Sequence, residues 1–528
     1  MKTFLLKKSG TISKAKLLLT NKWFLLLMNT LFFIMMAIVL PIHFETDDDV
    51  TMCQIANGRF SGNTDAHLVF INAILGWLIS SLYRVTRVVE WYTLVLCIFH
   101  VLAFSGIIYF VINDIRIHRV LKFVFILFVY TLWIRIIVGF QFTTTAGALC
   151  CCGCMALLRP SKKCKALGVM SVFIASLVRF QVAGLVGLLF IPFFVADFLQ
   201  NKKFAFWLSI TFLVVLMGKR GDSFFYRSSE WIDYKEYNSL RGGVLDDSKS
   251  SKALQYMPNG IQIDDFELFV KFEGDPKVIT TEKLRLVKEA MQEEDIRQSL
   301  SSNLYGMIRY RVPLFFIFLG FFSGIYINVK QKREKWTWVL LCELGLFAVT
   351  LFYMCVMWNV KERVFFVMLM PSIYILVRAL PERMNHGRIL ITCVMLGLVF
   401  KYIYQDYKMF GSVHDGKRYV EDYQIPLVIM RKEKVFSIEF WEQYLPPFGI
   451  KDLNYQVRGL GWSALSPLNK GILESHLDLV NPNWAIFTQV DDPPVDIAKA
   501  IERNYGVKVD VVCVDNNEKY ALYKLVKQ

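Results

Sequence analysis

Charged residues are scarce in this chain of 528 residues, of which only 20% are Asp, Glu, Lys or Arg. Hydrophobic residues make up 55% of the sequence and aromatic residues 15%, and the mean hydropathy is +0.40. So little charge beside so much apolar residue argues against a set of soluble domains and indicates an integral membrane protein. The formal charge of +15 then raises first the question of which loops hold the lysines and arginines.

The cysteines lack any pattern of pairs. They number eleven, an odd count, and most lie inside apolar runs, so the sequence indicates no disulfide framework, zinc ribbon or redox pair. The densest cluster, at 150–154, resembles a metal site on paper but lies inside an apolar segment, where small residues assist helix packing. A structural or acylated role is therefore favoured over a metal site.

The N-terminus lacks both acidic residues and a cleavage site. The first 22 residues contain six lysines and no acid, and the apolar run 23–42 follows. This pattern resembles a signal peptide, but the run has about the ~20 residues that span a bilayer, and no small-x-small motif follows it. We expect a retained membrane anchor whose N-terminus lies in the cytoplasm.

The segment 67–83 decides the predicted topology. It is only about 17 residues long and contains Asn72 and two serines, so an interfacial helix on the outer surface explains it better than a span. With this choice every basic short loop falls on the side of the N-terminus, as the positive-inside rule requires. A spanning segment would instead place the loops around Arg116, Lys162 and Lys332 outside.

The sequence thus predicts a polytopic α-helical membrane protein with about eleven transmembrane helices, the N-terminus inside and the C-terminus outside. The excess positive charge is largely explained by the cytoplasmic loops, and no nucleic-acid partner is expected. The predicted spans are 23–42, 91–112, 120–138, 146–158, 166–178, 182–199, 204–217, 313–329, 338–358, 364–377 and 389–404.

Five regions follow from this topology. They are a cytoplasmic basic N-terminus (1–22), an N-terminal transmembrane module (23–217) with a first outer loop (43–90), a long extracytoplasmic loop (218–308), C-terminal transmembrane helices (309–404) and an extracytoplasmic tail (405–528). The long loop contains a probable helix at 282–299, with Thr281 as its N-cap candidate. The tail predicts a strand at 484–488, a helix at 495–504 closed by Gly506, and strands at 507–514 and 520–526. A small α/β domain of about 430–528 is therefore expected.

Four carboxylates follow the first apolar run, in the sequence Glu45-Thr46-Asp47-Asp48-Asp49. Such a run repels itself, so hydration, a cation or nearby arginines must offset it. A solvated loop is the plain interpretation, but the position at the membrane boundary favours a functional one. Carboxylates there can act as a general base for a hydroxyl group or hold a divalent ion against a phosphate.

The order of these features resembles the GT-C superfamily of membrane glycosyltransferases. The resemblance covers the architecture of nearly the whole chain, and its specific part is the acidic run together with the interfacial helix expected to begin near His67. Many members open that helix with His-Pro-Pro-Leu, whereas Leu68 and Val69 follow His67 here. The chain also looks like a bacterial branch with an Asp-Asp-Asp run and a Glu-Tyr-Asn-x-x-Arg segment, matched by residues 236–241.

The resemblance implies a bacterial cytoplasmic (inner) membrane protein that uses polyprenyl-phosphate-linked sugars and a catalytic Asp in the first outer loop. The lipid phosphate needs cations at the outer ends of the spans, and arginine suits it because its fork donates two parallel hydrogen bonds. The candidates that bind substrate are Arg179, Lys361, Arg363, Arg309 and Arg311, together with Glu45 and His67. For any one of these cations, binding of membrane lipid headgroups is an equal alternative.

Arg179 is the strongest candidate, because it lies between two apolar runs with almost no loop around it. We expect Arg179 or Arg363 to bind the donor phosphate and Asp48 to accept the proton of the acceptor hydroxyl, with Asp47 and Asp49 as alternatives for the base. A divalent ion, Mg²⁺ or Mn²⁺, is left open, with Asp48 and Asp49 as its ligands if one is bound.

The expected activity is transfer of a hexosyl or pentosyl group to an envelope glycan or a lipid-linked acceptor on the outer face of the membrane. One alternative is a transporter or flippase for lipid-linked glycans, for which Arg135 is the one clear mid-span candidate and no internal repeat is visible. Another is a non-catalytic assembly factor. Two weaker features are Asp264-Asp265, as a loop cap or part of an acceptor groove, and Trp462, as a sugar-stacking or a buried side chain.

Overall fold

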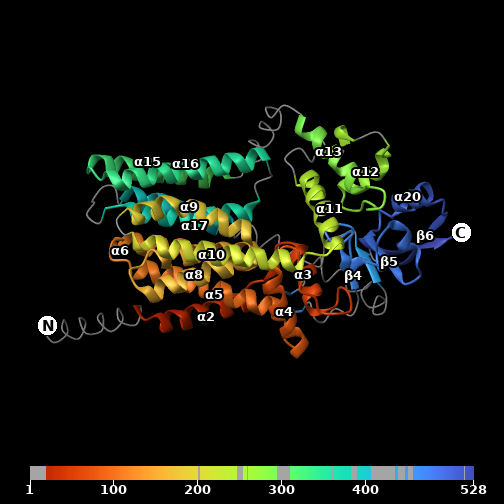
Figure 1. The fold of residues 1–528 in the computed structure, drawn as a ribbon, viewed down its shortest axis with the longest axis horizontal. Helices are drawn as coiled ribbons and strands as arrows, with labels where there is room; N and C mark the ends of the chain where they lie inside the picture. Colours follow the sequence, from red (N-terminus) through yellow and green to blue (C-terminus); the bar gives the residue numbers. More distant parts are fainter. Residues whose placement is uncertain are drawn as a thin grey trace.

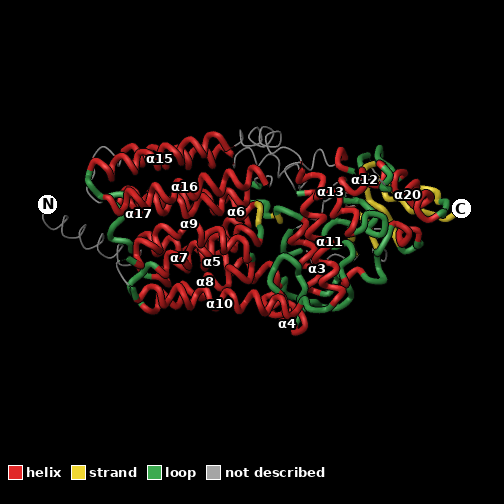
Figure 2. Tube along the Cα trace, turned by 45° about the horizontal axis from the view of Figure 1, so that its top comes forward, coloured by secondary structure: helices red, strands yellow, loops and turns green. Residues whose placement is uncertain are grey.

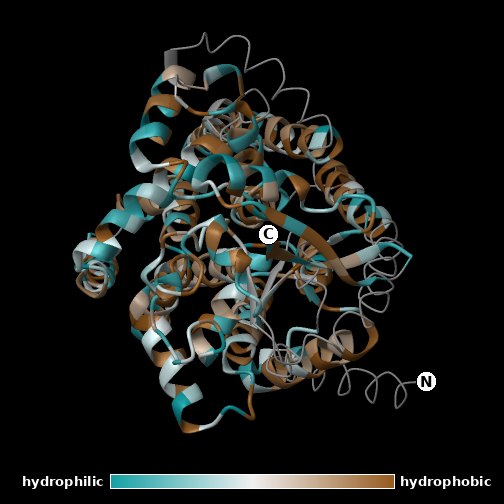
Figure 3. Cartoon of the chain, turned by 90° about the vertical axis from the view of Figure 1, so that its right-hand side faces the viewer, coloured by the Kyte–Doolittle hydropathy of each residue, from teal (hydrophilic) through white to brown (hydrophobic). Residues whose placement is uncertain are grey.

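The computed structural model combines a bundle of long helices with a smaller mixed region at one end, which carries the C-terminus (Figure 1). It describes residues 20–199, 202–246, 254–257, 260–293, 310–357, 361–381, 389–405, 434–437, 446–449, 456–516 and 518–528. The long strands cluster at the end that carries the C-terminus (Figure 2). Viewed onto that end, hydrophilic segments mix with hydrophobic ones (Figure 3).

The bundle contains a helix at each of the eleven segments predicted to span. They are α2 (Lys22–Val39), α5 (Trp91–Ile112), α6 (Arg119–Val138), α7 (Phe142–Leu157), α8 (Lys162–Val178), α9 (Phe180–Phe198), α10 (Lys203–Phe225), α15 (Arg311–Lys330), α16 (Glu334–Met357), α17 (Glu362–Ala379) and the helix Ile389–Gln405. Among the described residues, seven of these helices are long and apolar enough to cross a membrane: α2, α5, α6, α9, α10, α15 and α16. The polytopic membrane architecture is therefore confirmed, and the count of eleven spans stays a prediction.

Helix α7 is the centre of the bundle, because every one of its residues is buried. It packs most closely on α8, where a Cβ at Gly153 would lie 3.0 Å from the carbonyl oxygen of Gly168. The cysteine cluster at 150–154 is part of this helix and is wholly buried. The structure thus gives the cluster a packing role.

An ion-pair cluster closes the bundle at the end opposite the tail. Asp114 Oδ2 lies 2.7 Å from Arg378 Nε and 3.3 Å from Arg159 Nη1. Arg333 Nη1 donates to the carbonyl oxygen of Ala379 at 3.0 Å nearby. The structure thus brings together four loops or helix ends that the sequence assigns to one side of the membrane, and which side this end faces stays a prediction.

At the other end, a two-stranded parallel ribbon joins the start of the segment 43–90 to the α6–α7 junction. Strand β1 (His43–Phe44) pairs with β2 (Gly139–Phe140), and the amide of Glu45 extends the pairing by donating to the carbonyl oxygen of Phe140 at 3.1 Å. Helix α3 (Asp47–Asn57) follows at once. The sequence predicted loop here, and the helix is a correction to that expectation.

The expected interfacial helix is α4 (Ala73–Val85), which exposes Trp77 and Leu78. Its predicted start near His67 is wrong by several residues, because the Asn72 side chain caps the helix by accepting from the amide of Ile74 at 2.9 Å. His67 therefore lies in the loop before the helix.

The mixed region contains three helices of the long loop: α11 (Ser229–Leu245), α12 (Ile263–Val270) and α13 (Thr281–Glu293). The part of the predicted helix at 294–299 lies outside the described residues. The tail contributes α20 (Val495–Tyr505), which ends at Gly506 in the left-handed conformation (φ 67°), as predicted. It also supplies β3 (Lys434–Ser437), β4 (Gln456–Arg458), β5 (Trp484–Gln489), β6 (Val509–Asn516) and β7 (Tyr520–Lys527).

These strands form one sheet in the order β4-β3-β5-β7-β6, parallel from β4 to β5 and antiparallel from β5 to β6. The tail and the long loop share a single hydrophobic core, to which α11, α12 and α13 contribute as well as the sheet and α20. The predicted pair Asp264-Asp265 belongs to this junction: Arg503 of α20 lies 3.0 Å from Asp264 and 2.5 Å from Asp265. Its role here is to hold α12 on α20.

Candidate functional site

The acidic run lies in the first turn of α3, directly after the β1–β2 ribbon. Asp47, Asp48 and Asp49 are the first three residues of the helix, and Thr46 is its extended N-cap. A helix N-terminus carries a partial positive charge, so this turn favours negative side chains. The ribbon fixes the turn against the α6–α7 junction, and the acids are thereby held in place rather than left on a free loop.

Asp49 is the buried member of the three. Its Oδ1 accepts a hydrogen bond from the hydroxyl of Tyr92 at 2.8 Å and one from the amide of Phe142, at the start of α7, at 3.4 Å. The side chain has no solvent exposure, and burial raises its pKa well above the ordinary value. Asp49 therefore joins α3, α5 and α7 and does not face solvent.

Asp47 and Asp48 are only half-buried. Burial, followed by the charge of Asp48, raises the pKa of Asp47 to about 7. Burial also raises the pKa of Asp48, but the positive charges of Arg363, Arg179 and Arg241 act against it and favour the carboxylate. Asp48 is thus a partly dehydrated carboxyl group within the field of three arginines.

Arg363 lies at the start of α17 and reaches the acidic run. Its Nη1 is 3.7 Å from Glu45 Oε1, and the preceding residue, Glu362, lies 3.1 Å from Arg135 Nη2 near the end of α6. All four side chains are less than a third exposed. Two acids and two arginines therefore link the end of α6 and the start of α17 to the residues just before α3.

Arg179 and Arg241 approach from other elements. Arg179 is the single residue between α8 and α9, and its guanidinium lies 5.3 Å from the ring centre of Phe70 and 5.0 Å from that of Phe142. Arg241 comes from α11, is 8% exposed, and donates from Nε to Asn238 Oδ1 at 3.0 Å. Aromatic faces and an amide orient the two guanidinium groups without neutralising them.

The loop under Arg179 carries backbone strain. Val69 has a φ of 66°, which a β-branched residue rarely adopts, and its amide donates to the hydroxyl of Tyr226 at 2.9 Å. The next residue, Phe70, lies below Arg179. The strained residue thus sits beside one of the aromatic supports of the site.

The tail completes this part of the molecule. Thr93 Oγ1, near the start of α5, donates to the carbonyl oxygen of Pro447 at 2.8 Å, and the ring centre of Trp462 lies 4.9 Å from that of Phe70. Tyr234 of α11 donates its hydroxyl to the carbonyl oxygen of Trp462 at 2.7 Å. Trp462 is 8% exposed, so it is the buried side chain that the sequence left as one of two readings.

His67 lies apart from the arginines and has protein partners on both ring nitrogens. Nδ1 is 2.6 Å from Asp65 Oδ1, Nε2 is 3.2 Å from the carbonyl oxygen of Phe225, and the ring stacks on Trp231 at 4.5 Å. Burial lowers the pKa of His67, but the hydrogen bond and charge of Asp65 outweigh it and the net shift is upward. Its contacts fasten the loop before α4 to α10 and α11.

The remaining predicted cations are less informative. Lys361 and Arg311 are exposed at the starts of α17 and α15, and within the described residues neither forms an ion pair with the acidic run. Arg309 lies outside the described residues. The structure thus brings Glu45, the three aspartates, Arg179 and Arg363 together. Among the described residues, no ion pair or hydrogen bond joins Lys361, Arg311 or His67 to them.

Sequence reasoning did not include Arg241, Arg135 and Tyr92 among the binding or catalytic residues. A signal for Arg241 existed, because it ends the Glu-Tyr-Asn-x-x-Arg segment. Arg135 was noted as a mid-span charge, and the structure pairs it with Glu362. No sequence signal pointed to Tyr92, since one tyrosine at the start of an apolar run resembles any other.

The carboxylates of the site offer few ligands for a divalent ion. Across the described ranges, no three His, Cys, Asp or Glu side chains form a group that could hold a metal. Asp49 Oδ1 is engaged by Tyr92 and Phe142, and the side chain is fully buried. Among the described residues Asp48 and Asp49 therefore fit a shared metal poorly, whereas three arginines act on Asp48.

Comparison with known proteins gives few matches. No family model and no curated protein matches the chain. Among solved structures, it is similar to ArnT from Cupriavidus metallidurans in two crystal structures, one bound to undecaprenyl phosphate and one in the apo state. The identity is 10% in each case, the alignments cover 94% of this chain and 97% of the ArnT chain, and the TM-scores are 0.39 and 0.40.

Proposed function

We propose that this chain is a membrane glycosyltransferase that moves a sugar from a polyprenyl-phosphate-linked donor to a glycan or lipid-linked acceptor. The observation that carries the proposal is the surroundings of Asp48. Three arginines from separate elements, Arg363, Arg179 and Arg241, act on one half-buried carboxylate. Arginines at the end of a membrane bundle suit a lipid phosphate, and a carboxylate beside them suits the acceptor hydroxyl.

Each group has a defined part in the reaction. The acceptor hydroxyl gives its proton to Asp48 as its oxygen forms a bond to the anomeric carbon. The bond between that carbon and the phosphate oxygen breaks, and the electron pair leaves with the polyprenyl phosphate. Arg179 and Arg363 stabilise the charge that grows on the leaving phosphate. Because Asp48 is partly dehydrated, its raised pKa makes it a stronger base than a solvated carboxylate.

Asp48 is preferred over its neighbours for physical reasons. The side chain of Asp49 is not exposed to solvent and accepts a hydrogen bond from Tyr92, so an acceptor hydroxyl cannot reach it. Asp47 is half-buried but has only one arginine, Arg241, among the main influences on its pKa. We assign Asp47 the role of shaping the field around Asp48.

The membrane placement is part of the same proposal. Eleven helices cross the cytoplasmic membrane with the N-terminus inside, and the acidic run, the long loop and the tail lie on the outer face. The tail then forms the small α/β domain together with the helices of the long loop. This placement rests on the basic loops that gather at the opposite end of the bundle.

The test is transfer by purified protein in detergent micelles, supplied with total lipid extract that contains labelled polyprenyl-linked sugars. Wild-type protein releases polyprenyl phosphate, and Asp48→Asn lowers the rate at least ~100-fold, the lower range for loss of a general base. Asp264→Asn is the matched control, because that residue pairs with Arg503 away from the site. Micelles have no two sides, so a transporter would give no release in either protein, and unchanged release in Asp48→Asn would contradict the assignment of the base.

A further inference from the structure

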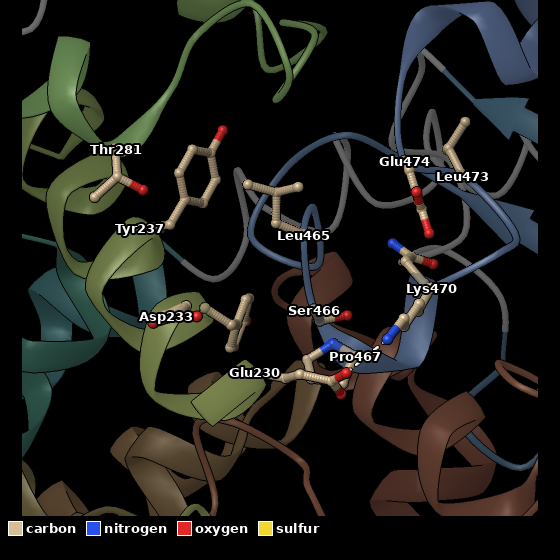
Figure 4. Close-up of a pocket in the computed structure, with 12 residues that line it drawn as sticks. Glu230, Asp233, Tyr237, Thr281, Leu465, Ser466, Pro467, Lys470, Leu473 and Glu474 are labelled. Carbon is tan, nitrogen blue, oxygen red and sulfur yellow. Dashed lines mark hydrogen bonds and ion pairs between the residues drawn. The ribbon is translucent and has the colours of Figure 1, made fainter. Parts of the chain in front are cut away.

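A cavity lies between α11, the start of α13 and the tail segment 465–474 (Figure 4). Its volume is about 260 Å³. Sites for drug-sized ligands usually measure ~300–1,000 Å³, so this cavity suits a single ring rather than a long chain. It is lined by Glu230, Asp233, Tyr234, Tyr237, Thr281, Leu465, Ser466, Pro467, Asn469, Lys470, Leu473 and Glu474.

Two of the lining side chains have polar atoms without a partner in the described structure. Ser466 is 3% exposed and Asn469 is 1% exposed, yet neither Ser466 Oγ nor Asn469 Oδ1 has a hydrogen-bond partner. The amide nitrogen of Asn469 is fixed, since it donates to the carbonyl oxygen of Ser463 at 3.0 Å. A buried acceptor without a donor costs free energy, so the pair indicates a ligand that supplies hydroxyl groups.

The rest of the lining combines aromatic and acidic groups. Tyr237 lies between Thr281 and Leu465 and offers a ring, while Glu230 and Asp233 lie one turn apart on the same helix (Figure 4). Rings that cover the apolar face of a ligand, with carboxylates and amides that bond its edge, form the combination that a sugar ring requires.

The charges of the lining select against acidic sugars. Glu230, Asp233 and Glu474 are negative, and Lys470, the one cation among the lining residues, is already 2.6 Å from Glu230. The net charge of the lining is therefore negative. A carboxylate or phosphate on the ligand would be repelled, whereas a neutral or amino sugar would not.

Helix α11 connects this cavity to the proposed active site. Tyr234 lines the cavity, and Arg241 lies seven residues further along the helix, ~10 Å by the rise of an α-helix and on the same face. The hydroxyl of Tyr234 lies within electrostatic range of Arg241 and of Asp48. A glycan that reaches Asp48 could therefore place its neighbouring sugar in the cavity.

We propose that the cavity binds one non-acidic sugar residue of the acceptor, next to the residue whose hydroxyl reacts. That the sugar belongs to the acceptor rests on the proposed function, whereas the binding of a sugar is argued from the cavity alone. Asn469 Oδ1 and Ser466 Oγ accept hydrogen bonds from the sugar hydroxyls, and Tyr237 covers the ring. The substrate is thus a glycan of at least two residues with a neutral or amino sugar before its acceptor end.

Direct binding tests the site apart from catalysis. Saturation-transfer NMR is recorded on full-length Asp48→Asn protein in nanodiscs with the methyl glycosides of glucose, galactose, mannose, N-acetylglucosamine and glucosamine, and with methyl glucuronide. At least one non-acidic glycoside binds, methyl glucuronide does not, and Asn469→Ala raises the Kd about tenfold, the effect of one lost hydrogen bond. Asn483→Ala, at an exposed position of the tail, leaves the Kd unchanged.

The outcomes separate the two proposals. If no non-acidic glycoside binds, if methyl glucuronide binds equally well, or if Asn469→Ala has no effect, the sugar site is wrong. Ser466→Ala is the second variant in case Asn469→Ala fails to fold, and thermal unfolding of each variant decides that. If Asp48→Asn retains transfer while the glycoside binds, the cavity remains a sugar site and the proposed base is wrong.

Discussion

Asp48 is the proposed base, whereas the adjacent Asp49 is a buried structural residue. Substitution of each by asparagine tests these two roles separately. Burial raises the pKa of Asp49 well above its ordinary value and so favours the neutral form, which asparagine mimics. The amide oxygen of asparagine can still accept from Tyr92, now at 2.8 Å, and from the amide of Phe142. We therefore expect the free energy of unfolding to change by less than about 1 kcal/mol and the transfer rate by less than about threefold.

The same substitution at position 48 removes the base. General-base catalysis contributes roughly 10²- to 10⁴-fold to the rate. At 1.36 kcal/mol per tenfold, this is about 3–5 kcal/mol of activation free energy. Asp48 is half-buried and faces arginines rather than a hydrogen-bonded tyrosine, so the fold should tolerate the amide. Asp48→Asn is thus expected to be folded and nearly inactive.

Alanine at position 49 provides the matched third variant. Asp49→Ala leaves the hydroxyl of the fully buried Tyr92 without its acceptor, which costs about 1–3 kcal/mol of stability. The initial rate of polyprenyl-phosphate release and the thermal unfolding midpoint are measured for all three variants. If Asp49→Asn is as inactive as Asp48→Asn while it unfolds at the wild-type temperature, burial does not decide the roles, and the assignment of the base fails.

Three further predictions follow from the same contacts. Arg363→Gln should weaken binding of a fluorescent polyprenyl phosphate about 10- to 100-fold, the value of a charge-assisted hydrogen bond, and the exposed Lys361→Gln should change it less than about threefold; equal effects of the two variants would contradict the assignment. Because the pKa of Asp47 is raised to about 7 in the folded protein, its contribution to stability is complete below its unfolded pKa and is lost as pH rises toward 7, so Asp47→Asn should flatten the pH dependence of the unfolding midpoint between about pH 4 and 7. Trp462→Ala removes the contact with Phe70 and should destabilise the fold by about 3–5 kcal/mol, measured by chemical unfolding, whereas a fully active and equally stable variant would show that the tail does not support the site.

The helices of the bundle could be predicted from sequence because the membrane imposes a simple rule on them. A segment that crosses the hydrocarbon layer must be apolar for most of its length and must pair its backbone internally, so hydropathy alone locates it. The predicted spans therefore coincide with helices, including the short α7 and α8. The α20 helix was equally accessible, because Gly506 marks its end.

Helix α3 was missed because nothing local distinguishes it. It begins with three carboxylates and mixes Gln, Thr and Asn with apolar residues, without a clear apolar face. Eight of its eleven residues are nevertheless buried, because α4, α5 and the ribbon surround it. The helix is made by its tertiary surroundings, which a sequence pattern does not contain.

The acidic residues of the candidate site could be predicted from the sequence, but only some of its basic residues could. The acidic run and Arg179 stand out against apolar neighbours, so position alone singles them out. Arg241 lies more than 190 residues from Asp48 in a polar segment, where an arginine is common and does not stand out. Trp462 and Pro447 are further still along the chain, and only the fold shows that they meet Phe70 and Thr93.

The contacts of the tail with α5 and α11 have a consequence for the folding of the protein during its synthesis. A ribosome makes the chain from its N-terminus, so the acidic run and Arg179 are translated long before Pro447 and Trp462. Until Pro447 and Trp462 have been translated and contact Thr93 and Phe70, the ring of Phe70 beneath Arg179 lacks its packing partner. A chain truncated before residue 447 would therefore retain Asp48 and Arg179 but lack the contacts of Pro447 with Thr93 and of Trp462 with Phe70.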